Sequence, residues 1–516
     1  MQQKKYITIL VLAAAAFASC SKDHLTLYPE GQINGATFYK TATDFQEAVV
    51  GAYVPLREAA LYSFYPEEMR SDNTEYDYNS KDRGGIGYEQ IADFMDDKSN
   101  GITSSVWTAD YKGIQRTNVI LDRLEKISDS VAITPAVRNQ TIGEAKALRA
   151  HYYFELVRLF GKLPLYLHET TDTKNAIVDH RSSIDSVYLQ IISDFTDALA
   201  LLPAVKFPQD GRWNKGSVST ELGLVYLTRK EYAKAIPLFE SVTTMGYDLM
   251  TNYADVFKLN NKLSKESIFE IQYKAGTDGQ SSSFIYRFMM YTPDTKGVLG
   301  VKYSNTSGGW NVPTDDIVSA YEPNDKRLDA SVAVQKGHMN KDGDYIPDSV
   351  SSILTVVPND TTIHKKMIRK QYQPSQGYGI NNNTDDDWPV YRYSDLLLML
   401  AECYNMTSRS GDALPLLNRV RDRAGLPPAT ETDPTALADI IAHERRVELA
   451  FENHRWFDLV RTDKAIPVMK AFGIAQKAKY GYLLPQSYDV NTNRLIFAIP
   501  FRETQYNPGL GQNDGY

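Results

Sequence analysis

The segment at residues 219–242 reads STELGLVYLTRKEYAKAIPLFESV. Five of its residues stand at the L-G-x-x-Y, Ala and Phe offsets of a tetratricopeptide helix pair: Leu222, Gly223, Tyr226, Ala235 and Phe239. In such a pair, small residues let two helices approach each other, and large residues fill the space between them. The segment therefore predicts two packed helices joined by a short turn.

The same offsets return 178 residues later, at Leu400, Ala401, Tyr404, Ala413 and Leu417. Copies so far apart form no tandem array, so the chain holds either two separated tetratricopeptide-like pairs or two unrelated helical hairpins. Apolar residues also recur every three to four positions in four earlier segments: 44–57, 107–127, 140–161 and 183–203. We expect a mainly α fold with a helical scaffold over about 36–251 and 389–465.

The helical pattern fails between about 252 and 388. This stretch is rich in Gly, Asn, Asp, Ser and Tyr, and its few β-prone runs include SIFEIQY (267–273) and SILTVVP (352–358). Long ordered loops on a rigid scaffold are the usual places for binding, so we expect the ligand face in this insertion. The stretch at 482–516 is turn-rich and polar, and residues 466–516 are expected to form an extended tail.

The N-terminus predicts export. Two lysines precede an apolar run from Ile7 to Phe17 and small residues at Ala18 and Ser19, as in a secretory signal. The small residues end at Cys20, so FASC at 17–20 resembles a bacterial lipobox, in which the cysteine becomes the acylated first residue. The alternative is an ordinary signal peptide with an incidental cysteine. The run is too short to span a membrane.

Composition and motifs exclude several classes. The net charge of −8 argues against a nucleic-acid partner. The second cysteine, Cys403, lies in an apolar segment and is expected to be a buried, inert thiol. The sequence contains no phosphate-binding loop, dinucleotide fingerprint or nucleophile elbow, and HERRV at His443 lacks the second histidine of a zinc site. We expect no cofactor.

Two acidic patterns need a structural explanation. NKDGDYIPD at 340–348 alternates oxygen ligands as calcium loops do, but it lacks their glycine and closing glutamate, so an Asp-Gly hairpin turn is favoured over a metal site. Eight charged residues crowd one helical segment: Glu444, Arg445, Arg446, Glu448, Glu452, Arg455, Asp458 and Arg461. Glutamates four residues apart repel unless arginines lie between them, so an interhelical ion-pair network is expected.

Four segments resemble a known family when they are taken in order. They are GEAKALRAHYYFELVRLFGKLPL (143–165), RYSDLLLMLAECYN (392–405), HERRVELAFENHRWFDLVR (443–461) and IPFRETQYNPGLGQNDGY (499–516). Together they resemble the signature segments of the SusD/RagB family, the nutrient-binding outer-membrane lipoproteins of Bacteroidetes. The resemblance implies tetratricopeptide-like helix pairs packed against an irregular loop-rich region with a few short strands.

The resemblance also implies a location and a partner. Residues 1–19 would be a lipoprotein signal peptide and residues 20–516 a single domain, anchored to the outer membrane through Cys20 and facing the cell exterior. Ser21, Lys22 and Asp23 resemble the short signal that sends such lipoproteins to the surface. The implied partner is a SusC-like TonB-dependent transporter, to which the protein would deliver captured oligosaccharides without catalysing a reaction.

Ligand residues can only be inferred from composition. Trp107, Trp213, Trp388 and Trp456 lie in or beside helical segments and are expected in the core, whereas Trp310 stands in the turn SGGWNVPT. Sugar rings stack on aromatic planes while polar side chains bind their hydroxyls. The candidates on loops are Asp72, Asn73, Tyr76, Tyr78, Tyr286, Tyr291, Tyr303 and Trp310.

Three alternatives stay open. Within the family, the ligand could be an oligopeptide rather than an oligosaccharide. Outside it, the chain could be a surface glycoside hydrolase, since 64 acidic residues leave a catalytic carboxylate pair possible. A tetratricopeptide scaffold that binds only partner proteins is the third.

Overall fold

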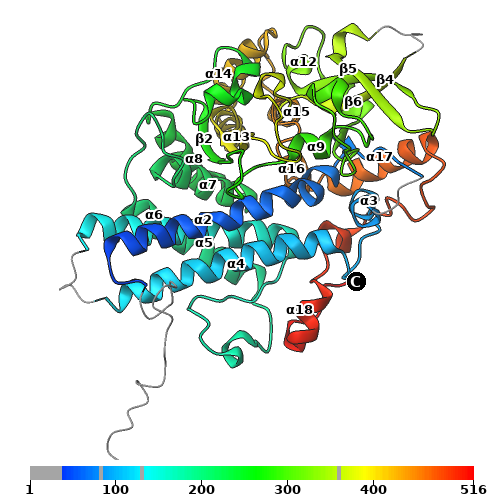
Figure 1. The fold of residues 1–516 in the computed structure, drawn as a ribbon. Coiled ribbons are helices and arrows are strands. Elements are labelled where there is room, and N and C mark those ends of the chain that lie inside the picture. Colours follow the sequence, from blue (N-terminus) through cyan, green and yellow to red (C-terminus); the bar gives the residue numbers. More distant parts are fainter. Residues whose placement is uncertain (1–37, 81–84, 128–132, 357–361) are drawn as a thin grey trace, which may run out of the picture.

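The computed structural model describes residues 38–80, 85–127, 133–356 and 362–516. Helices dominate it (Figure 1), and the long helices α2 (Ala42–Phe64), α4 (Gly101–Glu125) and α5 (Pro135–Phe160) lie side by side across its lower half. A small sheet and several loops occupy the upper right of the same view. The signal peptide, Cys20 and Ser21 to Asp23 lie outside the described residues.

Local sequence fixes where the scaffold helices begin. Thr41 forms a capping box with Asp44 at the start of α2, and Asn100 accepts two backbone N–H bonds at the start of α4. Thr134 and Pro135 begin α5 in the same way. Three further helices complete the first block: α6 (Ile184–Leu201), α7 (Lys215–Thr228) and α8 (Tyr232–Thr243).

Both tetratricopeptide-like segments form helix pairs, as predicted. The first pair is α7 and α8, and the second is α13 (Tyr393–Met406) and α14 (Ser410–Ala424). A Cβ atom at Gly223 would lie 2.3 Å from the ring of Phe239, so the glycine lets α7 and α8 approach closely. Because α8 packs on α13, the two pairs lie together despite their separation in sequence.

Short strands and helices build the insertion. The antiparallel sheet β5-β4-β6 is its largest sheet, and two-stranded pairings join β1 to β3 and β2 to β7. The strands are β1 (Thr74–Glu75), β2 (Ser267–Ile271), β3 (Val312–Pro313), β4 (Val332–Met339), β5 (Tyr345–Ser352), β6 (Ile363–Ile368) and β7 (Trp388–Arg392). The small helices are α9 (Phe284–Phe288), α10 (Lys296–Leu299), α11 (Asp315–Ala320) and α12 (Arg327–Ser331).

Two local predictions are settled by the sheet. The NKDGD segment is the turn of the β4–β5 hairpin, where Asn340 Oδ1 accepts the N–H groups of Asp342 and Asp344. Of SILTVVP, only Ser352 belongs to a strand, because Ile353–Thr355 form a 3-10 turn after β5 ends, and residues 357–358 lie outside the described ranges. The hydroxyl of Ser352 caps that turn and ends the strand.

The expected extended tail over 466–516 is wrong in its first part. Residues Ala465–Lys479 form helix α17, which packs beside α16 (Arg455–Arg461). Met469 and Phe472 bury one face of α17, and a Cβ atom at Gly473 would lie 2.2 Å from the Tyr488 side chain. Its apolar residues, among them Ile466, Met469 and Phe472, recur at helical spacing, so the turn-rich pattern of residues 482–516 does not extend back over α17. Beyond it, the chain forms turns and the short helix α18 (Phe501–Tyr506).

The charged residues predicted on one helix lie on two, α15 (Pro434–Glu448) and α16, with Glu452 between them, but the predicted ion-pair network is confirmed. Arg392 contacts Glu266 at 2.7 Å, Glu448 at 2.9 Å and Glu452 at 2.7 Å, and all four side chains are buried. Arg327, Lys370, Arg421 and Arg423 supply further cations to the same glutamates and to Glu444. Arginines therefore separate the carboxylates that would otherwise repel.

The core contains the residues expected there. Trp107, Trp213, Trp388 and Trp456 are buried, and so is the free thiol of Cys403, whose pKa burial raises. Among the helices of the described ranges, none is long and apolar enough to cross a membrane.

Candidate functional site

Trp310 is held at the surface by a turn that requires glycine. Gly309 adopts φ +88°, in the left-handed region. A Cβ atom at Gly308 would lie 2.2 Å from the Met289 carbonyl oxygen. The N–H of Gly309 donates to Met289 O at 2.7 Å, and the N–H of Trp310 donates to Arg287 O at 3.0 Å. The SGG sequence thus fixes the indole against the end of α9.

Other rings pack around this indole. Its ring centroid lies 4.8 Å from that of Tyr88 on α3 (Ile86–Asp93) and 6.3 Å from those of Tyr76 and Tyr65. A Cβ atom at Gly85, which precedes α3, would lie 2.4 Å from the indole, so glycine is needed for this approach. The indole remains partly exposed.

A second group of rings continues from the first. Tyr78 and Tyr482 stack with centroids 4.1 Å apart and an interplanar angle of 6°. Tyr480 lies 5.2 Å from Tyr482, and Tyr76 joins the two groups at 5.8 Å from Tyr482. We call the partly exposed rings of Tyr78, Tyr88, Trp310, Tyr480 and Tyr482 the aromatic platform.

A pocket of about 190 Å³ opens in front of Trp310. Tyr88 and Tyr291 line it with the indole, and Asp77, Glu89 and Arg287 are among its polar groups. The pocket therefore combines aromatic faces with charged hydrogen-bonding groups, as a sugar site does.

Two carboxylates accept hydrogen bonds from tyrosines in and beside the platform. Tyr480 donates its hydroxyl to Glu75 Oε1 at 2.8 Å, and Tyr76 donates to Asp93 Oδ2 at 2.9 Å. Burial and the charge of Asp93 raise the pKa of Tyr76, which keeps this phenol protonated. Tyr480, and Tyr76 beside the platform, are therefore oriented before any ligand arrives.

The structure corrects part of the predicted ligand set. Asn73 is fully buried, and its amide bonds Glu68 and Arg446. Asp72 is also buried, and both of its carboxylate oxygens accept bonds from Arg455 at 2.8 Å. Burial opposes its ionisation, but the bonds from Arg455 and the charges of Arg455 and Arg446 outweigh burial and lower the pKa of Asp72. Both residues tie the chain after α2 to α15 and α16, and Asp72 also lines a groove of about 750 Å³ together with Arg446 and Arg455.

The tyrosine predictions divide. Tyr78, Tyr291 and Trp310 lie on the platform or line its pocket, and Tyr76 supports the platform from a buried position. Tyr286 is buried in a second small core, and Tyr303 donates its hydroxyl to the Gly379 carbonyl at 2.9 Å. Sequence analysis missed Tyr88, Tyr480 and Tyr482. The YGY run at 480–482 shows the same Gly and Tyr composition as the chosen loops, but it lies in the supposed tail.

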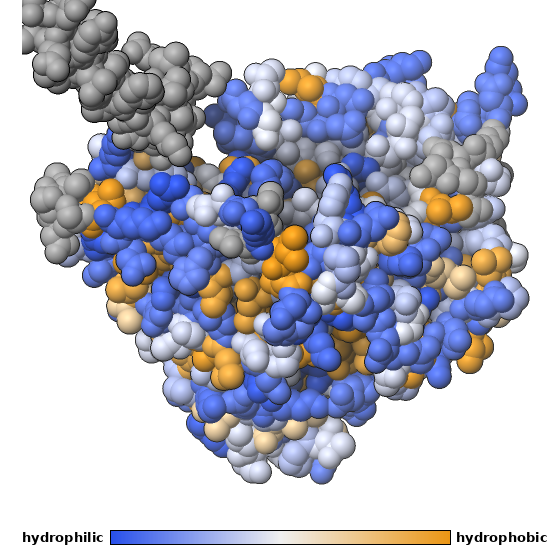
Figure 2. Space-filling view, turned by 90° about the horizontal axis from the view of Figure 1, so that it is seen from below, coloured by the Kyte–Doolittle hydropathy of each residue, from blue (hydrophilic) through white to orange (hydrophobic). Residues whose placement is uncertain are grey.

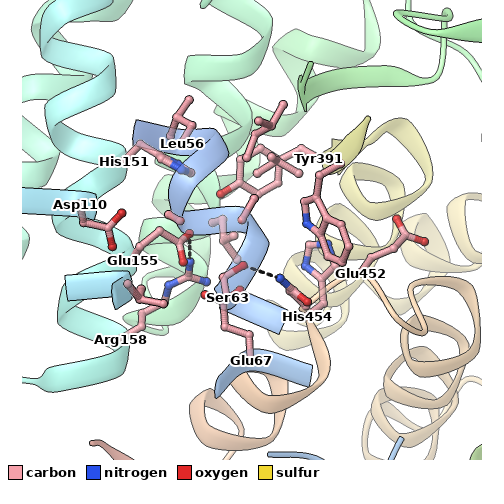
Figure 3. A pocket seen from close by; sticks show the side chains of 18 residues that line it. Leu56, Ser63, Glu67, Asp110, His151, Glu155, Arg158, Tyr391, Glu452 and His454 are labelled. Carbon is pink, nitrogen blue, oxygen red and sulfur yellow. Dashed lines mark hydrogen bonds and ion pairs between the residues drawn. The ribbon is translucent and has the colours of Figure 1, made fainter. Parts of the chain in front are cut away.

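Buried acids with shifted pKa values lie elsewhere. Figure 3 shows Glu67, Asp110 and Glu155 around a cavity of about 60 Å³, with Glu155 bonded to Arg158. Burial and the charge of Glu155 raise the pKa values of Glu67 and Asp110 well above the ordinary range. The space suits a few water molecules and cannot admit a sugar ring. These shifts therefore reflect burial, not a glycosidase acid in contact with a glycan.

No metal centre is evident in the described ranges. No group of three or more His, Cys, Asp or Glu side chains there is placed to hold an ion. The side-chain oxygen of Asn340, in the calcium-like segment, is occupied by turn hydrogen bonds.

Comparisons with known proteins give concordant matches. The model described as "SusD family" matches residues 265–516, and the one described as "Starch-binding associating with outer membrane" matches residues 34–227. SusD-like protein P38 of Formosa agariphila is 27% identical over 99% of this chain and 98% of its own. Starch-binding protein SusD of Bacteroides thetaiotaomicron is 24% identical over 78% of this chain and 76% of its own.

Solved structures share the fold. A laminarin-binding SusD-like protein is 25% identical, with a TM-score of 0.73 over 93% of this chain and 100% of its own. Surface glycan-binding protein A from Bacteroides thetaiotaomicron, solved with laminarihexaose, is 23% identical, with a TM-score of 0.73 over 92% of this chain and 99% of its own.

Proposed function

The chain belongs to the SusD family, and on that premise we propose that it is a non-catalytic surface lipoprotein that captures oligosaccharides on the aromatic platform. The captured ligand passes to a SusC-like TonB-dependent transporter. The observation that carries the proposal is the platform itself, which groups five partly exposed rings, two of which, Tyr88 and Trp310, line a pocket with charged side chains. The names of the relatives, which include starch-binding and laminarin-binding proteins, support a carbohydrate ligand.

The platform also favours an oligosaccharide over an oligopeptide. Flat rings that pack against one another suit the C–H faces of sugars, and carboxylates suit sugar hydroxyls. One common way to bind an extended peptide is through backbone bonds to an exposed strand edge. The platform residues lie on loops, on α3 and after α17, not along such an edge.

Calorimetric titration against hexasaccharides and peptides tests this proposal. Trp310→Ala should weaken oligosaccharide binding about tenfold, because one stacking interaction contributes about 1 kcal/mol or slightly more. Because the indole is partly buried against Tyr88, we expect Trp310→Ala also to lower the free energy of unfolding by about 1 kcal/mol. Tyr226→Ala, at a partly exposed ring on α7, is the matched control. Unchanged binding by folded Trp310→Ala, or binding of peptides alone, would overturn the proposal.

The anchor and the absence of catalysis need their own tests. Cys20→Ala should abolish incorporation of labelled fatty acid and release the protein from membranes. Alanines at Ser21, Lys22 and Asp23 should keep acylation but hide the protein from external protease. Purified protein should release no reducing ends from a glycan that it binds, and release that disappears when one carboxylate is removed would establish the hydrolase instead.

A further inference from the structure

A second groove lies away from the aromatic platform. It has a volume of about 600 Å³, within the usual range of ligand sites, and is bounded by α4, the loop at 164–177 and α18. It shares no lining residue with the pocket in front of Trp310. Figure 2 views the molecule from the side where α18 lies in Figure 1, and apolar residues there gather in small groups among polar ones.

Aromatic rings form the walls of this groove. Trp107 and Tyr111 have centroids 4.7 Å apart, and Tyr166 lies 6.0 Å from Tyr111 at an interplanar angle of 78°. Tyr111 donates its hydroxyl to Pro164 O at 3.0 Å, and Tyr166 donates to Ala176 O at 2.7 Å. These bonds fix the rings, so binding would cost little ordering. Tyr506 on α18 is 69% exposed and adds a ring that a ligand can cover.

Polar groups in the same groove remain available. Gln115 and Thr170 line it, and their side chains make no hydrogen bond with the rest of the described chain. The partly buried Glu503 adds a carboxyl group. The lining cation, Lys112, is already paired with Glu58 at 2.7 Å. This set offers an amide, a hydroxyl and a carboxylate, but no unpaired cation among the described lining residues.

We propose that this groove is a second carbohydrate-binding site, which takes a neutral oligosaccharide. A purely apolar ligand would leave the Gln115 amide without a partner. The Glu503 carboxyl, which Trp107 hydrogen-bonds, disfavours an anionic sugar, and the Arg502 guanidinium beside it is 5.5 Å from the Tyr506 ring centroid, so the anionic probe below tests the charge of the ligand. A sugar fits both the aromatic rings and the polar groups of the groove. Its C–H faces pack on the tyrosines, and its hydroxyls bond the polar groups. The proposal rests on the proposed function for its ligand class, but on different residues.

The experiment begins with a variant whose aromatic platform lacks its tryptophan. Trp310→Ala protein is titrated by calorimetry and by saturation-transfer NMR with millimolar laminarihexaose, maltohexaose, cellohexaose and xylohexaose, and with a hexagalacturonate as the anionic probe. Weak binding of a neutral hexasaccharide should persist. Adding Tyr506→Ala or Gln115→Ala should weaken it a further five- to tenfold, the change that about 1 kcal/mol per contact produces. Phe501→Ala on the same helix is the control, because Phe501 does not line the groove.

Each outcome separates the two proposals. If folded Trp310→Ala protein binds no probe while the wild type does, the second site is wrong and the platform stands. If residual binding ignores both groove substitutions, or belongs to the hexagalacturonate, the second site is equally wrong. If Trp310→Ala changes nothing and the groove substitutions remove all binding, the platform is wrong and the groove is the main site. Wild-type protein that binds none of the probes would overturn both.

Discussion

The buried charge network around α15 and the aromatic platform serve opposite purposes. In the network, arginines and glutamates are buried and bond one another, as Arg392 of β7 does with Glu448 and Glu452. Around Trp310, rings and polar groups stay partly exposed beside an open pocket. Side chains that satisfy one another hold the fold together, whereas side chains left open to solvent remain available to a ligand. Substitutions in the two regions should therefore affect different measurements.

The largest effect is expected at the centre of the charge network. Arg392→Met would remove one cation from three buried glutamates, and uncompensated buried charge is costly. We expect a loss of about 5 kcal/mol in the free energy of unfolding, measured by urea titration. Arg419→Met is the control, because its pair with Asp248 is exposed and should contribute less than about 1 kcal/mol. A loss below 1 kcal/mol at Arg392 would show that Arg327, Lys370 and Arg423 suffice.

A core tryptophan gives the next largest effect. Trp456 is fully buried and packs edge-on against Phe94, with ring centroids 5.7 Å apart. Trp456→Ala should leave a cavity and cost about 4 kcal/mol of stability. At a temperature where the variant is folded, its oligosaccharide affinity should equal that of the wild type. Thermal melts and calorimetric titrations of Trp456→Ala and Trp310→Ala, side by side, measure both quantities. If both variants lost mainly affinity, or both lost mainly stability, the proposed division between the buried core and the platform would be wrong.

The difference between helical segments and platform loops also explains which features could be predicted from the sequence. Gly223 and Phe239 stand at the fixed offsets of a tetratricopeptide helix pair, and within α15 and α16 the charged residues recur at three- and four-residue intervals because an α-helix has 3.6 residues per turn. Their structural roles could therefore be derived from the sequence. The helix α17 was missed because the turn-rich composition of residues 482–516 was extended back to residue 466, although Ile466, Met469 and Phe472 recur at helical spacing and Phe472 packs on Tyr488.

The site was predictable only in part. The turn SGGWNVPT indicated Trp310, since glycines on a loop place a large ring near the surface. Asp72 looked available because its partners, Arg446 and Arg455, lie more than 370 residues away in sequence. Tyr482 stacks on Tyr78 across a similar separation. Loop composition says which residues can bind, but only tertiary contacts decide which of them are already occupied.

A smaller effect on the free energy of unfolding is expected at Glu67, where a substitution should increase stability. Burial and the charge of Glu155 raise its pKa in the folded state, so the folded protein holds a proton that the unfolded chain releases above about pH 4. Wild-type stability therefore falls as the pH rises from about 4 toward the folded-state pKa. Glu67→Gln removes this penalty and should be more stable than the wild type by about 1 kcal/mol at pH 7, with little difference near pH 4.

Urea titrations across this pH range measure that difference. Glu47→Gln, at an exposed position on α2, should follow the wild type at every pH. A gap between Glu67→Gln and the wild type that stays constant with pH would contradict the titration of Glu67.

The smallest effect tests what the platform rings contribute. Tyr482 stacks face to face on Tyr78, and its ring, rather than its hydroxyl, makes that contact. Tyr482→Phe keeps the stack and should change oligosaccharide affinity by less than about twofold, whereas Tyr482→Ala should weaken it about fivefold, the share of one ring contact. Both variants should unfold within about 1 kcal/mol of the wild type, because the ring is partly exposed. Calorimetric titration of the two variants side by side measures the difference. If Tyr482→Phe loses as much affinity as Tyr482→Ala, the hydroxyl binds the ligand directly, and the platform recognises sugars by hydrogen bonding at this position rather than by stacking.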